Sequence, residues 1–294
     1  MLAIAQAGQQ FHYLSWTPTT TKPVLNGFGT KSYEKTDLSS SDFFSSLFSE
    51  LIELNKLSIP RIYVSLDMDT VHLSETQIPT DSDFENYQNW LNATNYDSEF
   101  SKRFETYYYP FDNKIEKSFN VHIPLPIKRA LISAIKKNNA ELRFLSLGVF
   151  SAESCVRSIY NSEKLDSYIV WRVGQYNFNE ILWIKKSQLI CFLRFKNMNN
   201  TFKVQNYYGC SKSADKILNQ LEKCTNNDYS NFKISDQIFI YSNTKNNADF
   251  LKITKSPNSQ FKSIDILNRF QSKNKNSNSF VFAETGLVFR GFDV

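Results

Sequence analysis

Three carboxylates lie close together in the first third of the chain: Asp67, Asp69 and Glu75. Carboxylate oxygens are the ligands that Mg²⁺ and Ca²⁺ prefer, so this spacing could form a metal site. The two aspartates, however, enclose a single methionine between two runs that are typical of strands. An Asp-rich connection of this kind favours a tight turn. We therefore expect a turn here and no metal site.

The other residues that commonly bind metals are scattered. The four cysteines have no Cys-x-x-Cys spacing and lie far along the chain from the three histidines, each of which occupies a strand-like run. These residues are Cys155, Cys191, Cys210 and Cys224, with His12, His72 and His122. The pattern predicts buried free thiols in a reducing compartment rather than a zinc site.

Composition excludes several classes of protein. The 294 residues are 41% hydrophobic and 15% aromatic, which indicates a folded protein with a substantial core. The net charge of +5 is modest, and basic residues are interleaved with acidic ones, which argues against nucleic-acid binding. The N-terminus has no signal-peptide pattern, and no run reaches the roughly 18 to 20 apolar residues of a membrane span. We expect a soluble cytoplasmic protein.

The elements that must position any site follow one order twice. A strand-strand-strand-helix-strand pattern spans 2–66, and a second copy spans 168–241. Between the copies, helical spacing predicts helices at 81–96 and 126–137. A repeated unit of this kind predicts an internally duplicated α/β fold.

Three segments carry a resemblance to a known family. The closing run Phe282 to Gly291 is similar to the last segment of the type IV pilus assembly protein PilM family, where a helix carries a Gly-Leu-Ala-Leu-Arg-Gly run. Phe202 to Gly209 resembles that family's strand-to-glycine stretch in the second domain. Phe119 to Leu147 resembles its inserted subdomain and the return to the main sheet. By the order and spacing of these segments, the chain resembles PilM, within the actin and FtsA superfamily.

The resemblance implies a duplicated actin-like, ribonuclease H-like fold of two domains. Domain I is expected at 1–165, with a small inserted subdomain at about 80–139. Domain II is expected at 166–294, with a reduced outer subdomain.

The resemblance also locates a nucleotide site. In this superfamily two β-hairpins with Asp-x-Gly turns close on ATP, because glycine lets backbone N–H groups approach the phosphates and the aspartate positions Mg²⁺ or water. The corresponding glycines here are Gly8 and Gly174. Gln6 and Arg172 stand where the two carboxylates belong, so an amide and a cation replace the groups that suit a metal ion.

Two further departures point the same way. His12 stands at the position of a basic residue, and Ser242 and Asn243 follow the strand where the family has a Gly-Gly turn against adenosine. We therefore expect a pseudo-ATPase with no cofactor. The alternative is an active ATPase or a sugar or acid kinase of the same fold, which would need Asp67 or Glu180 as its carboxylate.

PilM proteins hold the N-terminal tail of a membrane-anchored partner, PilN, on the cytoplasmic side. The resemblance implies the same role here: an adaptor of a type IV pilus or type II secretion-like platform, peripheral at the inner membrane. The groove is expected near 63–78 and 84–111, although an aromatic core in the insertion explains the run at 107–111 equally well. The residues expected to contact the tail are Tyr63, Phe84, Tyr87, Tyr107, Tyr108 and Tyr109.

Overall fold

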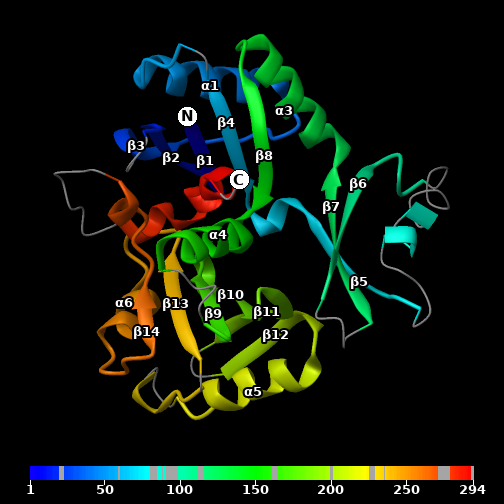
Figure 1. Cartoon of the computed structure of the whole chain (residues 1–294), viewed down its shortest axis with the longest axis vertical. Helices are drawn as coiled ribbons and strands as arrows, with labels where there is room; N and C mark the ends of the chain where they lie inside the picture. Colours follow the sequence, from blue (N-terminus) through cyan, green and yellow to red (C-terminus); the bar gives the residue numbers. More distant parts are fainter. Residues whose placement is uncertain are drawn as a thin grey trace. The chain divides into compact units, whose positions relative to one another are not determined.

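The computed structural model (Figure 1) places most of the chain in three sheets and their helices. The residues that it describes are 1–19, 23–58, 60–79, 85–87, 89–90, 99–111, 116–160, 165–198, 201–224, 229–234, 236–270 and 279–292. Among these residues, no helix is long and apolar enough to cross a membrane.

The first sheet is centred on β1 (Leu2–Ala7), whose six residues are all buried. β1 pairs antiparallel with β2 (Gln10–Thr17) and parallel with β4 (Arg61–Leu66). β3 (Val24–Ser32) and β8 (Glu141–Leu147) complete the order β3-β2-β1-β4-β8. A strand that is covered on both faces requires a nearly continuous apolar run, which is what the sequence of β1 provides.

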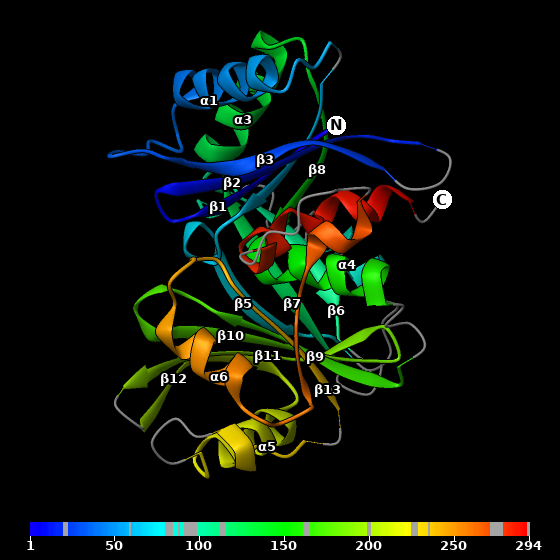
Figure 2. The same cartoon turned by 90° about the vertical axis from the view of Figure 1, so that its left-hand side faces the viewer.

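Two helices pack against each other beside this sheet. α1 (Ser41–Leu54) begins at Ser40, whose hydroxyl accepts a hydrogen bond from the N–H of Phe43. α3 (Leu125–Lys137) has a proline in its first turn, where the missing N–H costs nothing. Figures 1 and 2 show the two helices together at one end of the first unit.

A separate three-stranded sheet follows β4 in the chain. It has the order β5-β7-β6, with β5 (His72–Gln77) and β6 (Phe104–Pro110) at the two edges of β7 (Lys117–Pro124). The short 3₁₀ helix η1 (Met68–Thr70) leads into it. Because α3 packs on α1, it belongs with the main body, whereas the sequence had assigned it to the insertion. β6 itself was not predicted as a strand.

The predicted helix at 81–96 lies largely outside the described residues, and so does Phe84. Within the described part, Tyr87 stacks on Trp90 with ring centroids 5.7 Å apart, and its hydroxyl donates to the carbonyl of Gln77.

The second unit repeats the topology of the first. Its six-stranded sheet has the order β12-β11-β10-β9-β13-β14. The strands are β9 (Ser167–Val173), β10 (Phe178–Lys185), β11 (Gln188–Met198), β12 (Thr201–Gly209), β13 (Gln237–Ser242) and β14 (Phe261–Ser263). As in the first sheet, three sequential strands are antiparallel, and the first of them pairs in parallel with the strand after the helix. The predicted duplication is thus present, with β12 added at one edge.

Helices and short 3₁₀ turns complete this unit. The helices are α4 (Gly148–Tyr160), α5 (Ser211–Leu221) and α6 (Ala248–Lys255). The 3₁₀ elements are η3 (Gln175–Asn177), η5 (Tyr229–Asn231), η6 (Ile266–Arg269) and η7 (Ser279–Phe292).

The chain divides into compact units at Leu147, so that Met1–Leu147 and Gly148–Val294 are separate. The boundary at residue 165 that the sequence suggested falls after α4 rather than before it. The reason is packing: α4 lies against η7 and β9 of the second unit. Gly286 allows this approach, because a Cβ atom there would lie 2.3 Å from Cβ of Cys155.

We expect Gly286→Ala to lower the free energy of unfolding by about 1–3 kcal/mol, since the extra methyl group must push η7 away from α4. Urea unfolding followed by tryptophan fluorescence measures the change. Gly27→Ala is the matched control, because its new methyl group would meet only the end of the Asn55 side chain, which can rotate away. Equal effects of the two substitutions would contradict the packing argument.

Candidate functional site

The first hairpin turn is closed by a side chain of its own unit. Gly8 has a φ of 61°, the left-handed conformation that glycine adopts without strain. Its N–H donates to Oδ2 of Asp67 at 3.0 Å, and the N–H of Asp67 donates to Oε1 of Gln6 at 3.2 Å. Gln6 and Asp67 are buried, at 4% and 6% exposed. The amide that would approach a phosphate therefore already binds a carboxylate.

Asp67 also organises the turn that follows β4. Its Oδ1 accepts from the N–H of Asp69, and its carbonyl accepts from the hydroxyl of Thr70 at 2.6 Å. Glu75, the third member of the acidic cluster, forms an ion pair with Lys117 on β7. No group of three metal-binding side chains occurs within the described ranges. Asp67 and Asp69 thus form a capped turn, as the sequence predicted, and Glu75 lies outside it on β5.

His12 takes part in the sheet. It is 1% exposed on β2, and its Nδ1 lies 2.9 Å from the hydroxyl of Thr30, its pairing partner on β3. A histidine held in this way belongs to the packing of the first sheet.

The second hairpin turn has a different geometry. Gly174 has a φ of −88°, and the left-handed residues are Tyr176 and Asn177. The N–H of Gly174 donates to the carbonyl of Phe178 at 2.7 Å, and a Cβ atom on Gly174 would lie 3.0 Å from that same oxygen. The glycine is thus required by a close backbone approach within the turn.

A buried ionic row crosses the second sheet below this turn. Pairing register places Tyr241, Arg172, Glu180 and Arg194 side by side on β13, β9, β10 and β11. Nη1 of Arg172 donates to Oε2 of Glu180 at 2.8 Å, and Nε of Arg194 lies 3.4 Å from the other oxygen of Glu180. Arg172 is therefore paired within the sheet.

Glu284 of η7 completes the network. Its Oε1 lies 2.9 Å from Nε of Arg172 and accepts from the hydroxyl of Tyr241 at 2.9 Å. Burial, followed by the nearby Glu284 charge, raises the pKa of Tyr241, so this hydroxyl remains a donor at neutral pH. Two arginines, Arg172 and Arg194, balance the two glutamates.

Sequence reasoning missed Glu284 as a member of this network. Its segment was recognised only by resemblance, and no local pattern links it to Arg172. A buried ion requires a partner, so an arginine inside an apolar strand could have prompted a search for acids. It could not have distinguished Glu284 from the other glutamates.

Ser242 is the last residue of β13 and Asn243 follows it, and both are buried. The Ser242 hydroxyl lies 3.2 Å from that of Thr244. Beside this loop is a cavity of about 310 Å³, between the β9–β10 turn and the start of α6. It is lined by Gly174, Gln175, Tyr176, Asn177, Thr244, Asn246, Asn247, Ala248 and Asp249. Its lining contains one carboxylate and no cation, which suits a neutral polar molecule better than a phosphate.

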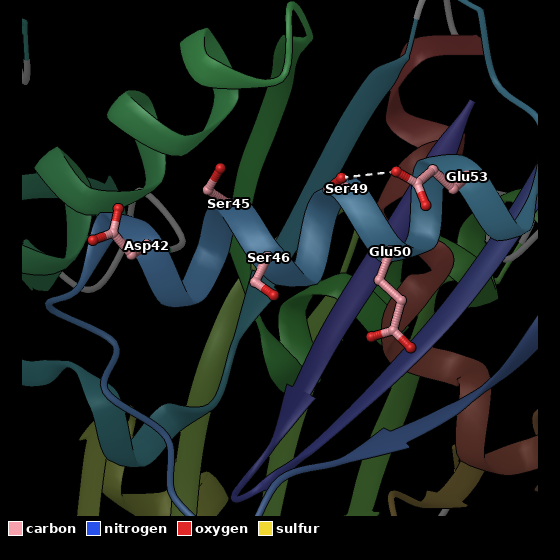
Figure 3. Close-up of a pocket in the computed structure, with 6 residues that line it drawn as sticks. All are labelled: Asp42, Ser45, Ser46, Ser49, Glu50 and Glu53. Atoms are coloured by element: carbon pink, nitrogen blue, oxygen red, sulfur yellow. Dashed lines mark hydrogen bonds between the residues drawn. The ribbon is translucent and has the colours of Figure 1, made fainter.

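A second cavity, of about 400 Å³, lies over a single helix. Figure 3 shows its lining residues projecting from α1: Asp42, Ser45, Ser46, Ser49, Glu50 and Glu53. Lys137 pairs with Asp42 at 2.7 Å, and Lys31 pairs with Glu50. This surface is the solvent-exposed face of α1.

The residues expected to contact a partner lie in different environments. Tyr63 is 4% exposed on β4 and packs between Trp16 and Phe144, with ring centroids 5.7 and 6.0 Å away. This burial corrects the expectation that Tyr63 lies on a binding surface. Two of the expected residues, Tyr107 and Tyr109, lie two positions apart on β6 and therefore share one face of the strand.

The three-stranded sheet β5-β7-β6 carries polar side chains on the face opposite Tyr107 and Tyr109. His122 accepts or donates at both ring nitrogens, 2.7 Å from the hydroxyl of Ser74 and 2.8 Å from that of Thr106. Burial lowers the pKa of His122 to about 4, so the ring is neutral at pH 7. Asn120 continues the row with a hydrogen bond to Thr76 at 2.6 Å. These contacts fix the position of β6 and its tyrosines.

We expect Glu284→Ala to lower the free energy of unfolding by about 3–5 kcal/mol. The substitution leaves the buried Arg172 with only one of its two glutamate partners, Glu180. Glu284→Gln should cost less, since the amide oxygen can still accept from Tyr241. Urea unfolding measures both. Glu222→Ala, at an exposed position, is the control and should stay within about 0.5 kcal/mol of the parent. A loss no larger than that of the control would contradict the proposed importance of the network.

No protein-family model matches the chain, and no curated protein sequence matches it. Among solved structures, a chain of the PilM-PilN type IV pilus biogenesis complex matches with a TM-score of 0.64 at 9% sequence identity. The match covers 100% of this chain and 98% of that one.

Two more distant matches are the cytoplasmic domain of EpsL, an inner-membrane component of the type II secretion system of Vibrio cholerae, and an inorganic polyphosphate/ATP-glucomannokinase from Arthrobacter sp. strain KM. Their TM-scores are 0.47 and 0.42, at 10% identity each. They cover 98% and 99% of this chain, and 94% and 98% of their own chains. The match over full length shows that this chain has the actin-like, two-domain fold found in the PilM-PilN complex.

Proposed function

We propose that the protein is a catalytically inactive adaptor of a type IV pilus or type II secretion-like assembly platform. In this role it binds the cytoplasmic tail of a PilN-like membrane protein and reaches the inner membrane through that partner. The observation that carries the proposal has two parts. The chain has, over its full length, the fold of a chain in the pilus complex. At its two hairpins, Gly8 and Arg172 already bind the carboxylates of Asp67 and Glu180.

The contacts of the hairpin groups support the proposed loss of catalysis. Phosphoryl transfer depends on carboxylates that hold Mg²⁺ and on amides that are free to meet phosphate. Asp67 holds the amide of Gly8, and Glu180 lies between Arg172 and Arg194. Freeing either carboxylate for a metal ion would leave a buried donor or cation unpaired, which costs several kcal/mol.

The edge strand β6 is the surface that we assign to the tail. Tyr109 is 46% exposed, and Tyr107 is held by Glu105 and Lys128, whose Nζ donates to its hydroxyl at 3.0 Å. An extended peptide can pair with an edge strand through its backbone while its side chains meet the aromatic rings. This assignment replaces the wider groove that included Tyr63.

We expect no heat of binding when Mg-ATP is titrated into the protein in a calorimeter, and no shift in Tm at millimolar Mg-ATP, because ligand binding would raise Tm. ATP binding together with phosphate release would instead support the kinase or ATPase alternative. In that case Glu180→Gln should abolish the phosphate release.

We expect a fluorescent peptide that carries the cytoplasmic tail of a PilN-like single-span protein to bind with a Kd in the range of about 1–50 µM. Tyr109→Ala should weaken binding roughly tenfold, as loss of an exposed aromatic contact does. Tyr176→Ala is the control, because this tyrosine is 81% exposed but lies in the second unit. No binding at 50 µM, or equal effects of the two substitutions, would count against the assignment.

A further inference from the structure

The strand β12 is the part of the second sheet that the duplicated core does not account for. Within the described residues, the first sheet ends at β3, whereas the second continues past the corresponding β11 to a nine-residue edge strand. Figures 1 and 2 show β12 beside β11 at the margin of the sheet. Its six exposed residues are Thr201, Lys203, Val204, Gln205, Asn206 and Tyr207. A strand that buries so little contributes little to the core.

The edge is also weakly protected. Natural proteins shield long edge strands with proline, several charges or a short length. β12 contains no proline and a single lysine, Lys203. Its pairing with β11 has a bulge between the positions of Arg194 and Phe195. An edge of this length with so little protection is able to accept another strand.

The two faces of β12 differ in chemistry. Val204 and Tyr207, 37% and 51% exposed, pair with Phe195 and Leu193 and share the apolar face. Lys203 lies on the opposite face, directly across from Lys196 on β11. Lys196 in turn lies over the ring of Phe178, with Nζ 5.1 Å from its centroid.

Like charges directly across a strand pair destabilise the sheet. Lys196 and Lys203 nevertheless face each other, and in the described part of the chain neither forms an ion pair with an acid. One row further along, Arg194 also lies over Phe178 but is paired with Glu180. The charge is thus balanced inside the sheet and unbalanced at its edge. This arrangement complements a negative partner.

We propose that β12 is a second docking surface, which accepts an extended protein segment with acidic and apolar residues in alternation. The acidic side chains face Lys203 and Lys196, the apolar ones lie beside Val204 and Tyr207, and the backbone of the segment pairs with the open edge of β12. The surface lies in the second unit and is independent of the tail site assigned to β6.

The probe is a labelled peptide in which Glu alternates with Val. It has nine residues, the same length as β12. Fluorescence anisotropy with the full chain should show saturable binding. Lys203→Glu should weaken it roughly tenfold, and a peptide with Lys in place of Glu should regain affinity for that variant. Lys185→Glu is the matched control, an exposed lysine at the end of β10, which β11 separates from β12, and it should leave binding unchanged.

Two further peptides separate strand addition from simple charge attraction. A peptide of the same composition, with its glutamates in one block, should bind at least fivefold more weakly. N-methylation of the alternate amides that pair with β12 should abolish binding, and N-methylation of the others should not. Equal binding of the block peptide, or an unchanged Kd in Lys203→Glu, overturns the proposal. So does a dimer of the protein that forms through β12 and excludes the peptide.

Discussion

The second unit depends on one charged side chain that is held inside it. Arg172 lies on the central strand β9, 5% exposed, between a glutamate of the neighbouring strand and a glutamate of η7. The cost of burying its charge is large and is offset only by close partners. Because those partners belong to different elements, β9, β10 and η7 can reach their native positions only together.

The two hairpins show how one topology can be kept while its chemistry changes. In the first unit, a carboxylate from the turn after β4 accepts a hydrogen bond from the amide of Gly8. In the second unit, the carboxylates form ion pairs with arginines. Both solutions keep a tight turn at the end of a buried strand. In both, the amide or charged group at the hairpin has a partner within its own unit.

Much of the fold could be predicted because its strands and helices have clear patterns. The continuous apolar run of β1 and the helical spacing of α1 were both read correctly, and the repeat of the order revealed the duplication. β6 escaped prediction because its tyrosines are consecutive and do not alternate with polar residues. The assignment of α4 to the second unit depends on its contact with η7, which no local pattern encodes.

The site was harder to predict than the fold. Residue types indicated that Gln6 and Arg172 do not suit a metal ion, but not which groups they contact. Asp67 was considered as a turn or as a catalytic carboxylate, and only the structure joins it to Gly8. Tyr63 was placed in the groove by the family resemblance, and the sequence of β4 cannot reveal that the rings of Trp16 and Phe144 cover it.

The contact between Asp67 and Gly8 has a thermodynamic consequence. A protein whose native state needs a nucleotide gains stability in proportion to the logarithm of the nucleotide concentration. Here the corresponding interaction is intramolecular, so its contribution to the free energy of unfolding is constant. A protein built in this way would keep the same folded population in a starved cell as in an energy-rich one.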